Sequence, residues 1–156
     1  HRIARLGIGL VPEGRRVFGK LSVTENLTAA AAKGYWTLSR VYDYFPRLEE
    51  RAGPTAETLS GGDQQMLVIG RAPMTNPRLL LLDEATEGLA PVIRSEIWAT
   101  LHRLKTEGLS VLIVDGALQE LLGLADHCSI LERSKTGWSG LPADLSTEIS
   151  GRYLGI

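Results

Sequence analysis

The sequence predicts an α/β fold in which a partial, mainly parallel sheet is flanked by helices and carries a small helical subdomain. Two observations support this. Short apolar segments typical of strands alternate with segments that have helical spacing, which is the pattern of a parallel sheet. Residues 79–82 are four consecutive leucines, as expected for a central strand buried on both faces. The 156 residues are enough for one core of ordinary size without disulfides or a metal.

The N-terminal third predicts a strand followed by two short helices. Residues 6–11 are apolar and punctuated by glycine, which indicates a strand. Ser22 and Glu25 match a capping box, in which each side chain satisfies a free backbone amide of the other at a helix start. We therefore expect one helix over residues 23–32 and another over residues 38–48.

A linker and then a glycine-initiated helix follow. Residues 51–58 contain Gly and Pro and read as the linker, and the two glycines at 61–62 open a helix that begins at about residue 63. Pro73 lies where this helix would otherwise continue, and a proline in a helix interior costs about 3 kcal/mol. The helix is therefore expected to stop near Ala72.

The C-terminal half predicts further strands and helices in alternation. Pro91 stands where a first helical residue is favoured, and apolar residues recur at helical spacing from there to Gly108. A strand, a helix and a second strand are expected next, over residues 110–114, 118–125 and 128–131. The last strand starts at Cys128, which we expect to be buried.

Composition excludes several classes of function. Seventeen basic and eighteen acidic residues leave a net charge of -1, so the chain has no overall electrostatic footprint for nucleic acid or an anionic membrane. The single cysteine cannot form an internal disulfide, which fits a reducing cytoplasm. The leucine run at 79–82 is far shorter than the ~20 residues of a membrane-spanning helix.

Two short segments carry chemistry. Ser60, Gly61 and Gly62 start a helix, where exposed amides and the helix dipole favour a phosphate group. Asp83 and Glu84 follow the leucine strand, at the edge of the sheet where α/β folds bind ligands. The first acid can reach Mg²⁺ through water, and the second can orient or deprotonate an attacking water.

These segments resemble motifs of the ATP-binding cassette (ABC) transporter ATPases. Residues 59–65 are similar to the signature motif, residues 79–83 to the Walker B strand, and residues 87–90 occupy the D-loop position. The resemblance implies a partial P-loop-NTPase-like core, with ATP and Mg²⁺ as cofactors. It also implies a catalytic role for Glu84 and a water-mediated Mg²⁺ contact for Asp83. Four signature residues would contact ATP held by an opposite subunit: Ser60, Gly61, Gly62 and Asp63.

The sequence departs from the family pattern by lacking a P-loop, the Gly-x4-Gly-Lys-Ser/Thr segment that cradles phosphates. Residues 9–16 have the glycine spacing but contain a proline and a glutamate and no Lys-Ser/Thr pair. In the family the P-loop lies upstream of this segment. We therefore expect residues 1–156 to be a single truncated nucleotide-binding domain, with a helical subdomain at about 21–61 and the Walker B half of the core at about 62–156.

Two positions depart from the commonest family residues. Glu13 stands where most cassettes have the glutamine of the Q-loop, and Gly116 stands where many have the switch histidine. Glycine has no side chain with which to bond a γ-phosphate. Both departures also occur in the subfamily that this chain resembles.

That subfamily is the ATPase subunit of branched-chain amino acid importers. The resemblance runs through residues 11–18, 64–67, 74–78 and 87–91 to the C-terminal segment 152–155. Relatives that carry amides or urea share much of the pattern. The transported solute and the direction of transport therefore stay open, as does the origin of the truncation.

The resemblance implies transmembrane permease subunits and a second ABC ATPase subunit, paired head to tail, as partners, and no nucleic acid. It implies a cytoplasmic protein, peripheral on the inner face of the cell membrane. Without a P-loop the chain is expected to hydrolyse ATP weakly or not at all by itself. The alternative is a non-catalytic remnant or interaction protein that binds a permease or a second cassette.

Overall fold

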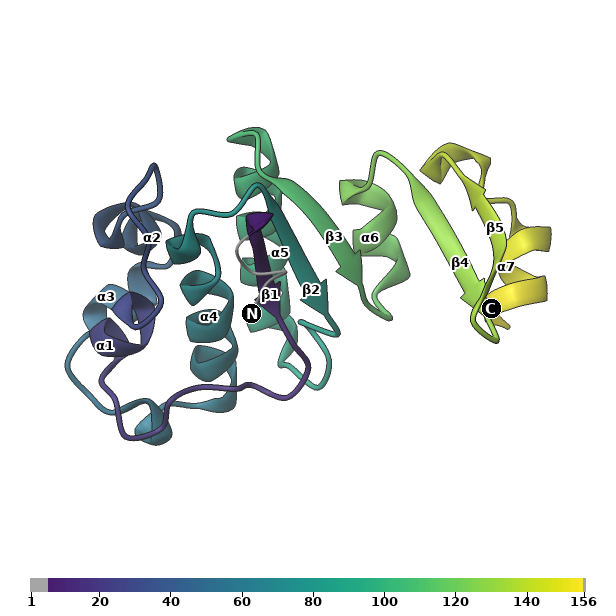
Figure 1. Cartoon of the computed structure of the whole chain (residues 1–156). Helices are drawn as coiled ribbons and strands as arrows, with labels where there is room; N and C mark the ends of the chain where they lie inside the picture. The colour runs from purple at the N-terminus through teal and green to yellow at the C-terminus, as the bar shows by residue number, and fades with distance from the viewer. Residues whose placement is uncertain (1–5, 156) are drawn as a thin grey trace. The chain divides into compact units, whose positions relative to one another are not determined.

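The computed structural model describes residues 6–155, and the chain forms two compact units, His1–Gly116 and Ala117–Ile156 (Figure 1). The first unit contains a parallel sheet with the strand order β1 (Ile8–Val11), β2 (Leu79–Asp83) and β3 (Ser110–Val114). Leu10, Leu81 and Leu112 are direct neighbours across the three strands. The predicted parallel sheet is confirmed, and it places the carboxyl ends of β1, β2 and β3 at one edge.

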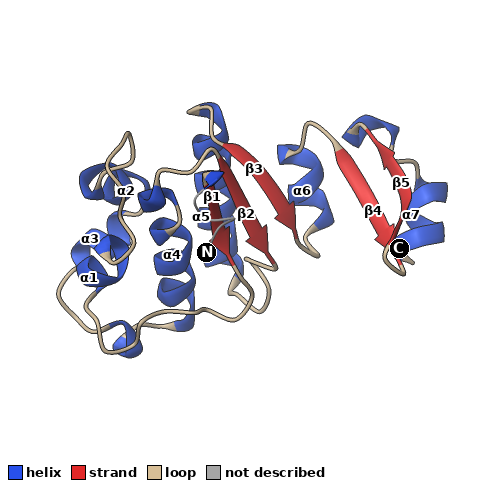
Figure 2. Cartoon of the chain, in the orientation of Figure 1, coloured by secondary structure: helices blue, strands red, loops and turns tan. Residues whose placement is uncertain are grey.

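The rest of the first unit is helical (Figure 2). Its helices and 3₁₀ turns are α1 (Val23–Thr28), α2 (Leu38–Tyr44), α3 (Pro46–Glu50), η2 (Ala56–Thr58), α4 (Gly61–Arg71), η3 (Pro73–Thr75) and α5 (Pro91–Thr106). The helix expected over 23–32 is shorter, ending at Thr28. The helix expected over 38–48 is two helices, because Pro46 disfavours helical backbone at Phe45 and itself begins α3.

The predicted helix ends follow from local chemistry. Ser22 and Glu25 form the expected capping box, with the Ser22 amide donating to Oε2 of Glu25 at 2.8 Å. Helix α4 ends at Arg71, as Pro73 predicted, and the chain passes through η3 to Asn76. The predicted start of α5 at Pro91 is also confirmed.

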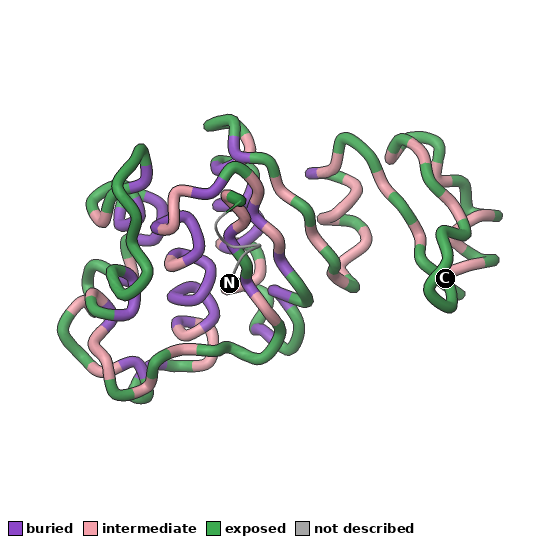
Figure 3. Tube along the Cα trace, in the orientation of Figure 1, coloured by how far each residue is buried: buried purple, intermediate pink, exposed green. Residues whose placement is uncertain are grey.

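The prediction that the leucine strand is buried on both faces is wrong for the described residues. Leu80 and Leu82 are fully buried in the core, whereas Leu79 and Leu81, on the other face, are half-buried. On that face the neighbouring Leu112 is 52% exposed. In Figure 3 buried residues are frequent in α4 and α5 and alternate with less buried ones along β1 and β2. The described residues of this unit thus cover one face of the sheet only.

The second unit is a small hairpin with helices. Its elements are α6 (Leu118–Leu124), β4 (Cys128–Glu132), β5 (Lys135–Gly140), η4 (Pro142–Asp144) and α7 (Thr147–Leu154). The strand expected over 128–131 is present, but it pairs antiparallel with β5 and not with the parallel sheet. Cys128 is half-buried and not buried as expected. No helix within residues 6–155 has the length and apolar character needed to cross a membrane.

Candidate functional site

The start of α4 displays the residues that were predicted to contact phosphate. Ser60 is the N-cap, and its hydroxyl accepts a hydrogen bond from the Asp63 amide at 3.2 Å. Ser60 is exposed, and Gly61 and Gly62 are half-buried. The first amides of an eleven-residue helix therefore lie near solvent, where the positive end of the helix dipole favours an anion.

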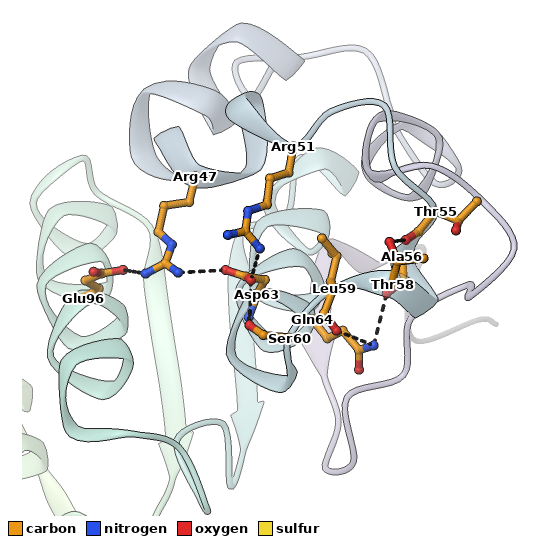
Figure 4. A network of polar contacts seen from close by, with 10 residues as sticks. All are labelled: Arg47, Arg51, Thr55, Ala56, Thr58, Leu59, Ser60, Asp63, Gln64 and Glu96. Atoms are coloured by element: carbon orange, nitrogen blue, oxygen red, sulfur yellow. Dashed lines mark hydrogen bonds and ion pairs between the residues drawn. The ribbon is translucent and has the colours of Figure 1, made fainter.

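The Asp63 carboxylate is only 1% exposed, and it is bonded to side chains of the same chain (Figure 4). It accepts hydrogen bonds from the Ser60 hydroxyl and from Nη1 of Arg51, both at 2.6 Å. Nη2 of Arg47 lies 3.2 Å from its other oxygen, and Arg47 also pairs with Glu96 of α5 at 3.5 Å. The buried carboxylate thus ties the start of α4 to α3, so any contact of Asp63 with ATP stays a prediction.

The segment that leads into α4 is held from within the helix. Nε2 of Gln64 donates to the carbonyl of Ala56 at 3.1 Å and to that of Leu59 at 3.4 Å. Within η2 the Thr58 hydroxyl donates to the Thr55 carbonyl at 2.7 Å (Figure 4). These bonds fix the direction in which the chain enters the helix.

A second cluster stands at the carboxyl edge of the sheet. Carboxylate oxygens of Glu13, Glu84 and Glu87 all lie within 4.8 Å of one another, and the three residues are exposed. A hydrogen bond with Glu87 raises the pKa of Glu84, and repulsion by Glu87, Glu13 and Asp83 raises it further. Carboxylate oxygens are the ligands that Mg²⁺ prefers, so the donor set fits that ion.

This cluster brings together two of the predicted site residues, Glu13 and Glu84, and adds Glu87, which sequence reasoning had placed only in the D-loop segment. Asp83, the predicted Mg²⁺ contact, is exposed beside the cluster but is not one of its three members. Its role stays a prediction. Gly116 is exposed, so that position offers only backbone groups.

Sequence reasoning missed the contact that positions Glu84. The Glu84 amide donates to the carbonyl of Val114 at the end of β3, at 2.8 Å. Thr86, which is 2% exposed, donates through its amide to Oδ2 of Asp115 at 3.0 Å, and its hydroxyl lies 2.9 and 2.8 Å from the two Asp115 oxygens. The loop after β2 is therefore fastened to the end of β3 on both sides of Ala85.

Arg15 lies against the start of α4. A methyl group added at Gly61 would collide with the Arg15 guanidinium, and one added at Gly88 would lie 4.0 Å from Nη2. The loop that carries Arg15 is held by Arg71 of α4, whose Nη2 donates to the carbonyl of Arg16 at 2.6 Å. This contact of Arg15 with the start of α4 is one that sequence reasoning missed.

Comparison with known proteins gives a consistent result. The ABC transporter family matches residues 1–87. The high-affinity branched-chain amino acid transport ATP-binding protein BraG of Pseudomonas aeruginosa is 43% identical over 98% of this chain and 69% of BraG. The Nod factor export ATP-binding protein I of Rhizobium etli is 33% identical over 96% of this chain, which spans 49% of that relative.

Solved structures share the fold at lower identity. The ADP conformation of an ATP-binding cassette of an ABC transporter gives a TM-score of 0.77 with 21% identity, covering 99% of this chain and 71% of that one. A nucleotide-free ATP-binding cassette gives a TM-score of 0.72 with 23% identity, covering 95% and 65%. These likenesses establish the cassette fold.

Proposed function

Because this chain belongs to the ABC transporter family, we propose that it derives from the ATP-binding subunit of an importer for branched-chain amino acids or related amides. The identity of 43% with BraG, over nearly the whole chain, supports this solute class. The nucleotide-binding part of the proposal rests on the start of α4. There Ser60 is exposed, and the Asp63 carboxylate is bonded to Ser60 and Arg51 of the same chain.

The start of α4 and the end of β2 have different tasks in this proposal. Ser60, Gly61 and Gly62 bind the γ-phosphate of ATP held by a second cassette, because their amides and the dipole of α4 stabilise negative charge. Glu84 would orient the water that attacks the phosphate, and Asp83 would hold Mg²⁺ through water. When bound, Mg²⁺ neutralises charge that develops on the phosphate oxygens.

The partners follow from the division of the site. We propose that the start of α4 contacts ATP held by the P-loop of a second ATPase subunit, paired head to tail, so that these residues supply one half of that nucleotide site. Transmembrane permease subunits are the other proposed partners, which places the chain in the cytoplasm at the inner face of the membrane. By itself the chain is proposed to hydrolyse ATP weakly or not at all.

Calorimetric titration of the purified chain with Mg-ATP tests this division. We expect no binding at micromolar strength, which corresponds to about -8 kcal/mol. Micromolar binding, or steady Mg-dependent turnover that Glu84→Gln abolishes, would show that the chain holds a complete site.

A second experiment tests the contribution of α4. The chain is mixed with the ATP-binding protein BraG from Pseudomonas aeruginosa as the second cassette, and ATP turnover is measured. We expect the chain to raise turnover and Ser60→Arg to abolish the increase. Ser146→Arg, at the N-cap serine of α7, is the matched control. If the two proteins bind but turnover does not rise, or if Ser60→Arg changes nothing, the non-catalytic interaction protein is the better description.

A further inference from the structure

The second unit has a hollow that none of the motifs above explains. It lies between the β4–β5 turn and α7 and has a volume of about 540 Å³. Two cations from the hairpin, Arg133 and Lys135, line it together with Arg152 from α7. Residues nearly twenty positions apart in the sequence thus bring positive charge to one place.

The charge of this unit is strongly segregated. Arg133, Lys135 and Arg152 are all the lysines and arginines between residues 117 and 155, and every one of them lines the hollow. The same stretch has five carboxylate side chains, of which Glu132 alone lines it. Within the described part of the chain, none of the three cations forms an ion pair. Unpaired like charges around one hollow attract an anion.

The turn between β4 and β5 places Arg133 in a backbone conformation that arginine does not favour. Arg133 and Ser134 have φ angles of 48° and 63°, so both residues of the two-residue turn are left-handed. Glycine and asparagine adopt this backbone most readily, and a long side chain such as arginine adopts it at a cost. The turn therefore carries a guanidinium where Asn would fit the backbone better.

On one side of the hollow, α7 packs closely against β5. A methyl group at Gly137 would lie 2.7 Å from Cε1 of Tyr153, so the absence of a side chain lets the ring lie against β5. The Arg152 guanidinium lies 5.1 Å from the centroid of the same ring. Gly137 and Tyr153 thereby fix the part of α7 from which Arg152 reaches the hollow.

We propose that this hollow is a binding site for a phosphate group. Guanidinium groups match phosphate oxygens with paired N–H donors, and Lys135 adds a point charge. The Thr136 hydroxyl, which also lines the hollow, is a further donor. The phosphate belongs to a free anion or to the headgroup of an anionic lipid, since both present the same oxygens. The proposal uses none of the residues at the start of α4 and does not depend on the proposed ATPase role.

The test uses the full chain and two probes. Inorganic pyrophosphate is titrated while the backbone amides are followed by NMR, and flotation is measured with phosphatidylglycerol and with phosphatidylcholine vesicles. For a free anion, we expect saturable shifts at Thr136, Gly137 and Arg152. For a lipid headgroup, we expect flotation with phosphatidylglycerol only. In either case Arg133→Asn and Arg152→Gln each weaken binding at least threefold.

The variants separate a site from a general charge effect. Arg133→Asn suits the left-handed turn, so its thermal midpoint should be unchanged or higher and its loss of binding cannot come from unfolding. Lys33→Gln removes one exposed cation from the first unit and should leave binding unchanged. Binding to neither probe overturns the proposal. An equal loss in Lys33→Gln, or undiminished binding in Arg133→Asn, also overturns it.

Discussion

The buried Thr86, in the loop after β2, and the half-buried Asp115, just after β3, join two neighbouring strands through hydrogen bonds. The Thr86 hydroxyl lies 2.9 and 2.8 Å from the two carboxylate oxygens of Asp115, and its amide donates to one of them at 3.0 Å. Glu84 stands two residues before Thr86 with a left-handed φ of 48°. The contact therefore holds in place the loop that carries the proposed catalytic carboxylate.

Removal of this contact should cost stability. Asp115→Ala leaves the amide and hydroxyl of the buried Thr86 without their acceptor, so we expect unfolding free energy to fall by about 1–3 kcal/mol in urea denaturation. Thr86→Ser keeps both donors and should cost less than Thr86→Val. Asp43→Ala, at an exposed position, is the control. If Asp115→Ala loses no more stability than Asp43→Ala, the hydrogen bonds between Thr86 and Asp115 do not stabilise the fold.

The buried carboxylate at the start of α4 gives a second prediction. Asp63→Ala removes the acceptor of Ser60 and Arg51 and the ion pair with Arg47, and we expect a loss of about 2 kcal/mol. The loss should stay below that of a fully buried ion pair, because both arginines keep contact with water. Glu49→Ala, an exposed acid of α3, should change stability by less than about 0.5 kcal/mol. Urea denaturation of both variants measures the difference, and equal losses would contradict the anchoring role.

The acidic cluster predicts a dependence on pH. Since Glu87 is the leading cause of the raised pKa of Glu84, Glu87→Gln should lower that pKa toward its ordinary value of 4.5, as read from ¹³C NMR of the Glu84 carboxyl. When folding raises the pKa of a carboxyl group, the folded protein loses stability as the pH rises from 4.5, the ordinary pKa, toward the pKa in the folded state. Glu87→Gln should therefore lose less stability across that range than the wild type. Glu120→Gln is the control and should leave the pKa of Glu84 unchanged. If Glu87→Gln also leaves it unchanged, Glu84 and Glu87 do not interact.

Local signals let the sequence predict several elements correctly. Ser22 with Glu25 marks the start of α1, Pro73 marks the end of α4, and Pro91 begins α5. Each of these residues acts on backbone within a few positions of itself. The strand β5 was missed because its turn, Arg133–Ser134, lacks the Gly or Asn that usually signals a hairpin.

Contacts across long sequence separations were beyond sequence reasoning. Asp63 reads as part of a phosphate-binding segment, and only the docking of α3 shows that Arg51 engages its carboxylate. Thr86 and Asp115 are 29 residues apart, and nothing in either segment specifies the other. Four leucines predict a strand but do not determine how much of each face other elements cover.

Asn76, in the turn before β2, gives the last prediction. Its Oδ1 accepts a hydrogen bond from the Trp36 amide at 2.7 Å, and its Nδ2 donates to the carbonyls of Ala32 at 2.7 Å and Trp36 at 3.1 Å. Its φ of 50° is left-handed, so the residue serves both the backbone turn and the attachment of the segment before α2. Substitution can separate these two contributions.

Asn76→Gly keeps the favoured backbone and loses the three bonds, so we expect a loss of about 1–3 kcal/mol in urea denaturation. Asn76→Ala loses the same bonds and must also hold a left-handed backbone, which adds about 1 kcal/mol. The difference between the two variants therefore measures the backbone term, and the loss in Asn76→Gly measures the side-chain bonds. Equal stability of Asn76→Gly and the wild type would show that the bonds to Ala32 and Trp36 contribute nothing to folding.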